Sequence, residues 1–340
     1  MADRIRLLVG GEHGLDLVSS DDGGRSWTAP EAAIRDVEVS AIAQAPDGAV
    51  YVGTRGSGLL RNREGVSTWE SVDLAPGMEK VRSICIADGR FVVGTEAGTA
   101  PAGVYEWLDR RSWQPLGDVM TCPGSSQWWY PVPTEGVHVR HLSFDTHRKE
   151  QIYAAVQVGG VAISPDDGET WSDRRNLDLD VHMVEPHPRR PGTVYAGSGG
   201  GGLYRSEDYG ETWQCISEGC GNFIVQFALD PRDPDRMYLP TATGHVPNWG
   251  KDPAGARGEM FRTDDGGDTW RKLQGGLPES LKSRINTIVL DGDEPDRVYI
   301  GAGLSRRTGG ADGGVYFSSD RGENWRKIMD ADEPLALLTV

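Results

Sequence analysis

The sequence predicts an all-β protein built from repeated four-stranded units, on three observations. A phrase of eight residues ending in tryptophan occurs five times in the 340 residues. The closing tryptophans, with those of two degenerate copies, lie 42 to 58 residues apart, about the length of one propeller blade. The 46 glycines and 20 prolines favour short strands and tight turns. Together these predict a single seven-bladed β-propeller over residues 1–340.

The repeated phrase follows the pattern Ser/Thr-x-Asp-x-Gly-x-Thr/Ser/Asn-Trp. Its carboxylate can accept hydrogen bonds from backbone N–H groups further along the turn, and glycine supplies the positive φ. Tryptophan buries a large apolar face between sheets. The phrase therefore predicts a hairpin staple; a calcium or substrate site is the alternative, less favoured because the phrase recurs in blade after blade. The aspartates are Asp22, Asp166, Asp208, Asp265 and Asp320.

Two degenerate copies and the two chain ends complete the blade count. Residues 62–69 and 106–113 keep the length and the tryptophan but lose the aspartate and the glycine. The first blade starts one strand late, and the apolar segment 335–340 has no partner at the other end. If that segment supplies the inner strand of the first blade, no sheet edge stays open. The predicted blades cover 1–28 with 335–340, 37–72, 80–118, 138–174, 180–216, 223–273 and 284–328.

The phrase resembles the Asp-box, or BNR repeat, of sialidase-like β-propellers. The resemblance implies an upper face, formed by the loops after each second strand and the loops between blades, with active sites around the central axis. It covers nearly the whole chain as architecture but not the sialidase catalytic set. That set includes an Arg-Ile-Pro segment near the N-terminus, and the nearest match here, residues 284–286, lies in the seventh blade and lacks proline. Xyloglucan-cleaving relatives use a cleft between two propellers, which one propeller cannot make.

Two long insertions are expected on the upper face, and long ordered loops on a rigid scaffold tend to carry function. The insertions are residues 117–136 and 241–258, and both contain aromatic side chains. A third segment, 303–314, contains arginine. The aromatic side chains form either the wall of a substrate pocket or a plug that caps the channel. The candidate substrate-binding residues of these segments are Trp128, Trp129, Tyr130, Trp249 and Arg306.

Arginine and histidine supply the candidate chemistry of the inner strands. Arg82 and Arg140 occupy equivalent strand positions, where they could bind an anionic group or pair with carboxylates of the next blade. His141, His182 and His245 are the candidate acid/base residues, because imidazole titrates near neutral pH. A divalent metal on these three and His13 is possible, but no metal-ligand spacing supports it. No cofactor is certain.

Charge and hydropathy narrow the function classes. The net charge of −16 opposes nucleic-acid binding. No apolar stretch is long enough to span a membrane or to form a signal-peptide core, which predicts a cytoplasmic protein unless a leader has been removed. The expected function is an enzyme, a hydrolase or lyase, acting on a small-molecule or carbohydrate ligand, possibly anionic, in an upper pocket near the axis. The alternative is a non-catalytic binding or assembly-scaffold propeller.

Overall fold

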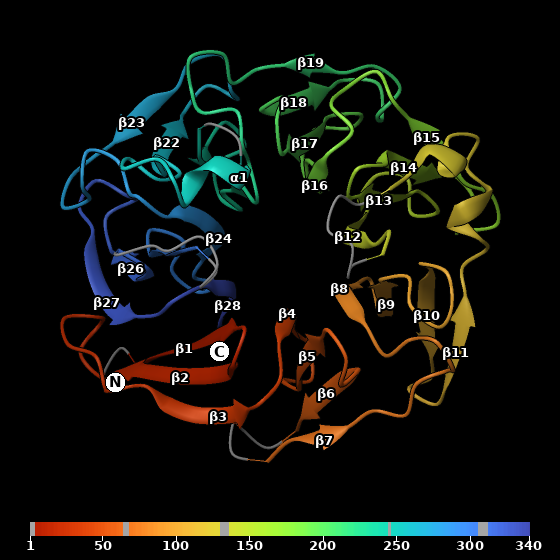
Figure 1. The fold of residues 1–340 in the computed structure, drawn as a ribbon, viewed down its shortest axis with the longest axis horizontal. Helices are drawn as coiled ribbons and strands as arrows, with labels where there is room; N and C mark the ends of the chain where they lie inside the picture. Colours follow the sequence, from red (N-terminus) through yellow and green to blue (C-terminus); the bar gives the residue numbers. More distant parts are fainter. Residues whose placement is uncertain (1–3, 64–67, 130–135, 244–245, 305–311) are drawn as a thin grey trace. The chain divides into compact units, whose positions relative to one another are not determined.

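The computed structural model describes residues 4–63, 68–129, 136–243, 246–304 and 312–340. These form seven four-stranded sheets, and the fold is a seven-bladed β-propeller (Figure 1). The described helices are short: η1 (Val119–Thr121), η2 (Ser125–Gln127) and α1 (Val246–Trp249). The chain divides into a first unit, Met1–Val39 with Ser217–Val340, and a second unit, Ser40–Ile216. None of the described helices has the length and apolar character needed to cross a lipid bilayer.

The second unit contains four blades, each a sheet in which consecutive strands pair. The strands are β4 (Val39–Gln44), β5 (Val50–Thr54), β6 (Leu59–Asn62) and β7 (Glu70–Ser71); β8 (Val81–Ala87), β9 (Arg90–Thr95), β10 (Val104–Leu108) and β11 (Ser112–Pro115); β12 (Val139–Phe144), β13 (Ile152–Val156), β14 (Gly160–Ser164) and β15 (Ser172–Arg174); and β16 (Val181–Pro186), β17 (Val194–Ser198), β18 (Leu203–Ser206) and β19 (Gln214–Cys215).

The first unit contains three blades, one of which joins both ends of the chain. Its strands are β28 (Pro334–Thr339), β1 (Ile5–Gly11), β2 (Gly14–Ser20) and β3 (Glu31–Arg35); β20 (Ala228–Leu229), β21 (Met237–Thr241), β22 (Glu259–Thr263) and β23 (Arg271–Leu273); and β24 (Arg284–Leu290), β25 (Val298–Gly303), β26 (Gly314–Ser318) and β27 (Arg326–Asp330).

The C-terminal strand completes the first blade, as predicted. β28 pairs antiparallel with β1, Leu8 facing Leu338, and the sheet order is β28-β1-β2-β3. The outer strand β3 lies at Glu31–Arg35, beyond the predicted blade limit of residue 28. Pro30 cannot donate to a ladder, so regular pairing resumes only after it.

The second strand of each blade is buried on both faces. Every residue of β13, β17 and β25 is buried. Their sequences are rich in small and β-branched residues, which fit a strand covered on both sides. Each of five such strands also carries one tyrosine with at most 1% of its surface exposed, and these rings form part of the core between sheets: Tyr51, Tyr153, Tyr195, Tyr238 and Tyr299.

The eight-residue turns are closed by their aspartates. In the turn after β18, Asp208 Oδ1 accepts from the Ser206 hydroxyl at 2.7 Å and from the Thr212 N–H at 2.8 Å, and Oδ2 accepts from the Thr212 hydroxyl at 2.6 Å. Gly210, at φ 91°, donates its N–H to Ser206 Oγ at 2.8 Å. The same pattern recurs at the other four aspartates. The carboxylate therefore acts within its own turn.

Replacing Asp208 with alanine is expected to lower the free energy of unfolding by roughly 1–3 kcal/mol, because the Thr212 N–H and two hydroxyls lose their acceptor. Denaturant unfolding measures the change. The control is Glu207→Ala in the same turn: its side chain is 75% exposed and pairs with Arg205, so a change of under about 1 kcal/mol is expected. Equal stability of both variants would contradict the role of the Asp208 carboxylate in closing the turn.

Candidate functional site

A network of buried polar side chains lies at the start of three neighbouring inner strands of the second unit. β8, β12 and β16 begin the third, fourth and fifth blades, and β12 contacts both others. Because the blades repeat, the side chains at the start of these strands come to equivalent places. We call this set the inner-strand network: Arg82, Glu96, His138, Arg140, Gln157, Asp180 and His182.

Gln157, which directly follows β13, connects the network. Its Oε1 accepts from Arg140 Nη1 at 2.5 Å and lies 2.7 Å from His138 Nε2. Its Nε2 lies 3.4 Å from His182 Nε2. Arg140 and His182 were predicted as site residues from the sequence, whereas Gln157 was not. The signal that would have found it is its place at the end of a second strand, where the upper-face loop begins.

Glu96 is a buried carboxylate held by three cations. Its side chain is 1% exposed and lies 2.7 Å from Lys80 Nζ, 3.4 Å from Arg82 Nη1 and 3.5 Å from Arg55 Nη2. A buried charge is tolerated only when it is paired in this way. Arg82 thus pairs with a carboxylate, but with one that follows β9 of its own blade and not with one of the next blade, as the alternative to a ligand had it.

His138 is held as a neutral imidazole. Its Nδ1 lies 2.9 Å from the Gly136 carbonyl oxygen and its Nε2 lies 3.0 Å from Arg82 Nη2. Burial, and then the charge of Arg82, lower the pKa of His138 well below its usual value. Nδ1 thus faces an acceptor, the Gly136 carbonyl, whereas Nε2 lies between a donor, Arg82 Nη2, and an acceptor, Gln157 Oε1 at 2.7 Å.

His182 forms the network's histidine–carboxylate pair. Its Nε2 lies 3.2 Å from Asp180 Oδ1, and the His182 side chain is 1% exposed. Burial alone would raise the pKa of Asp180, but His182 and Arg140 lower it to about 2, so the carboxylate is ionised at neutral pH. An ionised carboxylate orients an imidazole for proton transfer. Asp180 was missed by sequence reasoning, although residues two apart on an extended segment share a face.

His141 lies outside these contacts. The ladder between β12 and β13 shifts register between Val139 and His141, and the ring of His141 bonds the Val184 carbonyl of β16. Burial lowers the pKa of His141 to about 4, and its Nδ1 is buried with no hydrogen-bond partner. No hydrogen bond of the described residues joins it to His182.

The remaining histidine and loop candidates are spread over the chain. His13 is exposed and belongs to the first unit. His245, Arg306 and Tyr130 lie outside the described residues. Within the described ranges, no group of three or more His, Cys, Asp or Glu side chains could hold a metal ion.

The tryptophans of the insertions differ in exposure. Trp128 is 7% exposed and packs in a core cluster with Val119, Cys122 and Val156. Trp249, in the first unit, is 3% exposed, with its ring 4.9 Å from that of Phe223. Both rings are therefore part of core clusters. Trp129, by contrast, is 59% exposed.

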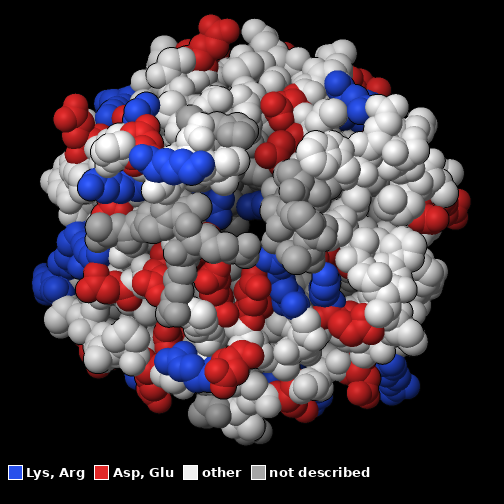
Figure 2. All heavy atoms as spheres, in the orientation of Figure 1, with Lys and Arg blue, Asp and Glu red and all other residues white. Residues whose placement is uncertain are grey.

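The network is rich in cations within an acidic protein. On the visible face, acidic and basic side chains lie beside one another in several places (Figure 2). Around the described part of the network, four cations stand against the two carboxylates Glu96 and Asp180, in a chain with a net charge of −16: Arg55, Lys80, Arg82 and Arg140. Such a local surplus attracts anionic ligands.

Glu185, on β16, is a second, partly buried acid of the same unit. Desolvation raises its pKa to about 8. Burial, and then the charge of Glu185, raise the pKa of the Cys85 thiol on β8 to about 12. Since the unfolded chain loses the Glu185 proton above a pKa of 4.5 and the folded chain keeps it to about 8, the contribution of Glu185 to stability falls as pH rises between these values.

Glu185→Gln is therefore expected to be more stable than the wild type at pH 8, by roughly 2–4 kcal/mol, and nearly equal to it at pH 5. Glutamine resembles the protonated acid but cannot ionise. Denaturant unfolding at both pH values measures the difference. The exposed variant Glu207→Gln should follow the wild type throughout, and a Glu185→Gln effect independent of pH would contradict the assignment.

Comparison with known proteins relates the chain to several propellers. The model of the Sortilin-Vps10 family (sortilin, neurotensin receptor 3) matches residues 201–335. A xyloglucanase from Paenibacillus sp is 33% identical over 119 residues, which are 33% of this chain and 10% of that protein. The chain thus spans about a tenth of the length of the curated relative it matches.

Solved structures of low identity share the fold. The GH74 xyloglucanase from Xanthomonas campestris (TM-score 0.64, 16% identical) covers 94% of this chain, and 46% of its own chain is matched. The GH74 enzyme of Niastella koreensis (TM-score 0.65, 18% identical) covers 95% of this chain, and 46% of its own chain is matched. YCF48 from Cyanidioschyzon merolae (TM-score 0.61, 17% identical) covers 92% of this chain, and 90% of its own chain is matched. The chain matches about half of each GH74 structure and nearly all of YCF48, and these likenesses establish a seven-bladed β-propeller.

Proposed function

We propose that the chain is an enzyme that acts on a carbohydrate at the inner-strand network. The observation that carries this proposal is the His182–Asp180 pair, at 3.2 Å, within a cluster that has a surplus of positive charge. The 33% identity to a xyloglucanase over 119 residues supports a sugar as ligand. On the same proposal, the eight-residue turns are Asp-boxes with a structural role.

Each side chain has a distinct role in this proposal. His182 is the proton-transfer group, and Asp180 orients its ring. Arg140, with Arg82 behind it, binds the carboxylate of an acidic sugar, for which the planar guanidinium is suited. His138, neutral between Gly136 and Arg82, holds the side chain of Arg82 in place. His245 and Arg306 remain proposed contributors from the loops.

Two reactions are consistent with a sugar-acting site. Hydrolysis of a glycosidic bond ordinarily uses two carboxyl groups, and the xyloglucanase likeness supports it. In the described network, however, Glu96 is committed to three cations. Elimination needs a base and a neutralised carboxylate: His182 takes the proton from the carbon next to the carboxylate, a carbon–carbon double bond forms, the glycosidic C–O bond breaks, and the departing oxygen takes a proton from water. The network itself favours elimination.

The experiment is a substrate screen of the whole chain on neutral xyloglucan and on polygalacturonate. New reducing ends report either reaction, and ultraviolet absorbance of a conjugated double bond reports elimination alone. We expect products from at least one polymer, with the acidic one preferred. Reducing ends without absorbance would select hydrolysis. No product from either polymer would contradict an enzyme of this class.

A non-catalytic binding propeller is the second candidate. It is favoured by the match to YCF48, which covers about nine-tenths of both chains, and one YCF48 structure contains a bound D1 peptide. A binding propeller of this kind would take up an extended peptide and release no product. Peptide binding by wild-type protein that is inactive in the screen would select this function.

A further inference from the structure

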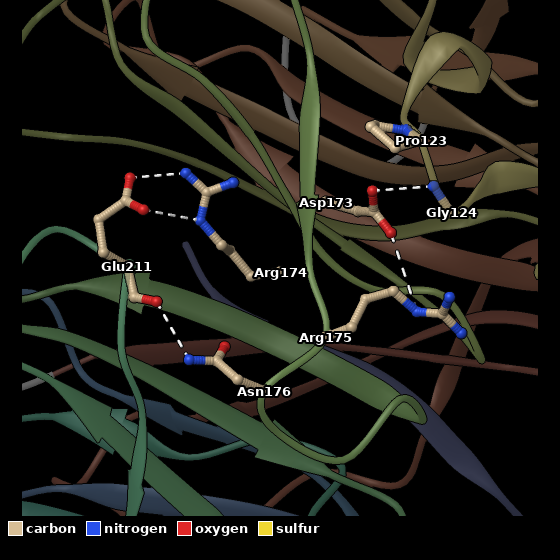
Figure 3. A pocket seen from close by; sticks show the side chains of 7 residues that line it. All are labelled: Pro123, Gly124, Asp173, Arg174, Arg175, Asn176 and Glu211. Atoms are coloured by element: carbon tan, nitrogen blue, oxygen red, sulfur yellow. Dashed lines mark hydrogen bonds and ion pairs between the residues drawn. The ribbon is translucent and has the colours of Figure 1, made fainter.

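An open pocket of about 430 Å³ lies along β15, at the opposite edge of the sheet from the network (Figure 3). β15 is the outermost strand of the fourth blade, and β12, which carries Arg140, is the innermost. The pocket is formed by the residues around the end of β15, by the 123–124 loop and by the turn that contains Glu211. It is thus distinct from the inner-strand network.

Asp173, which lines this pocket, has a buried side-chain oxygen without a hydrogen-bond donor. Its side chain is 3% exposed, and its Oδ1 accepts from the Gly124 N–H at 3.0 Å. Its Oδ2 has no hydrogen-bond partner, because Arg175 Nε is 3.9 Å away, too far for a hydrogen bond (Figure 3). A buried acceptor in this state is costly, and a ligand hydroxyl placed between Asp173 and Arg175 would satisfy it.

The other polar groups of the pocket balance one another in charge. Arg174 donates to both oxygens of Glu211, at 3.1 and 2.6 Å, so this pair is neutral. Asp173 and Arg175 form a second such pair. Asn176 donates its Nδ2 to the Glu211 carbonyl at 3.1 Å, which leaves its Oδ1 as an acceptor. A pocket with no net charge and with both donors and acceptors fits a neutral polyhydroxyl ligand better than an ion.

An exposed tryptophan lies only two residues along the chain from a side chain that contacts Arg175 of the pocket. Arg175 Nη1 donates to Gln127 Oε1 at 2.8 Å, and Trp129 follows two residues later. Trp129, 59% exposed, is one of the few large apolar side chains that the described residues expose. Tryptophan offers a flat apolar face with a polar edge, which suits the C–H face of a sugar ring.

We propose that this pocket is a binding site for a neutral glucan residue. Its hydroxyls donate to Asp173 Oδ2 and to Asn176 Oδ1 and accept from Arg175, while Trp129 covers an adjoining ring. The proposal requires binding only and does not rest on the reaction proposed at the network. It adds a second point of contact for a polymer outside the inner strands.

The test is titration of cellotetraose into the full chain, followed by NMR of the backbone amides around Asp173 and of the tryptophan indoles. Asp173→Asn keeps the acceptor for Gly124 but replaces Oδ2 with a donor, and Trp129→Ala removes an exposed ring. Each is expected to weaken binding roughly tenfold or more at an unchanged melting temperature. The matched control Asp109→Asn, at an exposed turn, should bind as the wild type does.

His182→Asn separates the two proposals. It is expected to bind cellotetraose normally, because the pocket lies at the other edge of the sheet. If wild-type protein does not bind cellotetraose, or if Asp173→Asn and Trp129→Ala both bind like the wild type, the pocket proposal is wrong, whatever the substrate screen gives. Loss of binding in His182→Asn alone would place the glucan at the network and overturn it equally.

Discussion

Deletion of residues 334–340, which removes β28, is expected to leave the protein unfolded and aggregated. β1 would lose its partner over five paired residues, from Leu7 to Gly11, and become an open edge, which favours association with other chains. Leu337, buried with Val9 and Tyr299 in the core cluster of the first unit, would be lost as well. Burial of one such side chain alone stabilises a fold by roughly 1.5–3 kcal/mol.

Soluble yield and melting temperature measure this effect. The control is deletion of Val340 alone, which removes one hydrogen bond, from its N–H to the Arg6 carbonyl, and leaves the β28–β1 ladder in place. That variant is expected to stay soluble with a small decrease in melting temperature. A soluble 334–340 deletion with the wild-type melting temperature would show that the closing strand is dispensable.

The second large effect is expected from His182→Asn, which should reduce kcat on the substrate found in the screen by roughly 10²–10⁴-fold, the usual contribution of a positioned acid or base. Asparagine can hydrogen-bond within the network but cannot take a proton from the substrate. KM should change little if Arg140 supplies most of the binding. Steady-state kinetics measure both constants.

Thermal unfolding distinguishes a catalytic from a structural role. His182→Asn should melt within a few degrees of the wild type, and the control His147→Asn, at an exposed hairpin, should keep full activity. A His182→Asn protein that is folded and fully active would remove His182 from the mechanism. Loss of activity only in proportion to loss of folded protein would indicate a structural histidine.

The features of the fold that repeat could be predicted from the sequence. The tryptophan spacing gave the number of blades, and the apolar segment at the C-terminus gave the closing strand. Both depend on periodic or local patterns. The start of β3 could not be placed by pattern alone, because the prediction ended the blade at residue 28 and the ladder resumes after Pro30.

The site was only partly predictable, because its contacts join residues far apart in the chain. Equivalent strand positions brought Arg82, Arg140 and His182 to one region. Gln157 and Asp180 become visible as partners only when the blades are assembled. A register shift between Val139 and His141 directs the His141 ring toward Val184, and single-sequence patterns do not show such bulges.

The aromatic insertion shows the same limit. Trp128 and Trp129 are adjacent, yet Trp128 is 7% exposed and Trp129 is 59% exposed. From the sequence, both were expected to share one role, either as the wall of a pocket or as a cap. Which ring enters the core depends on the two short helical turns before them, η1 and η2, and on the apolar space next to Val156. Packing of this kind is decided by the tertiary structure.

The most direct test of the proposed site is calorimetric titration of tetragalacturonate into His182→Asn, which should bind the acidic sugar without consuming it. Adding Arg140→Gln to this variant is expected to weaken binding roughly tenfold or more, because the guanidinium pairs with the sugar carboxylate. Binding is also expected to be weaker at high salt. Unchanged affinity after Arg140→Gln, or no binding by His182→Asn, would contradict an acidic-sugar site at the inner-strand network.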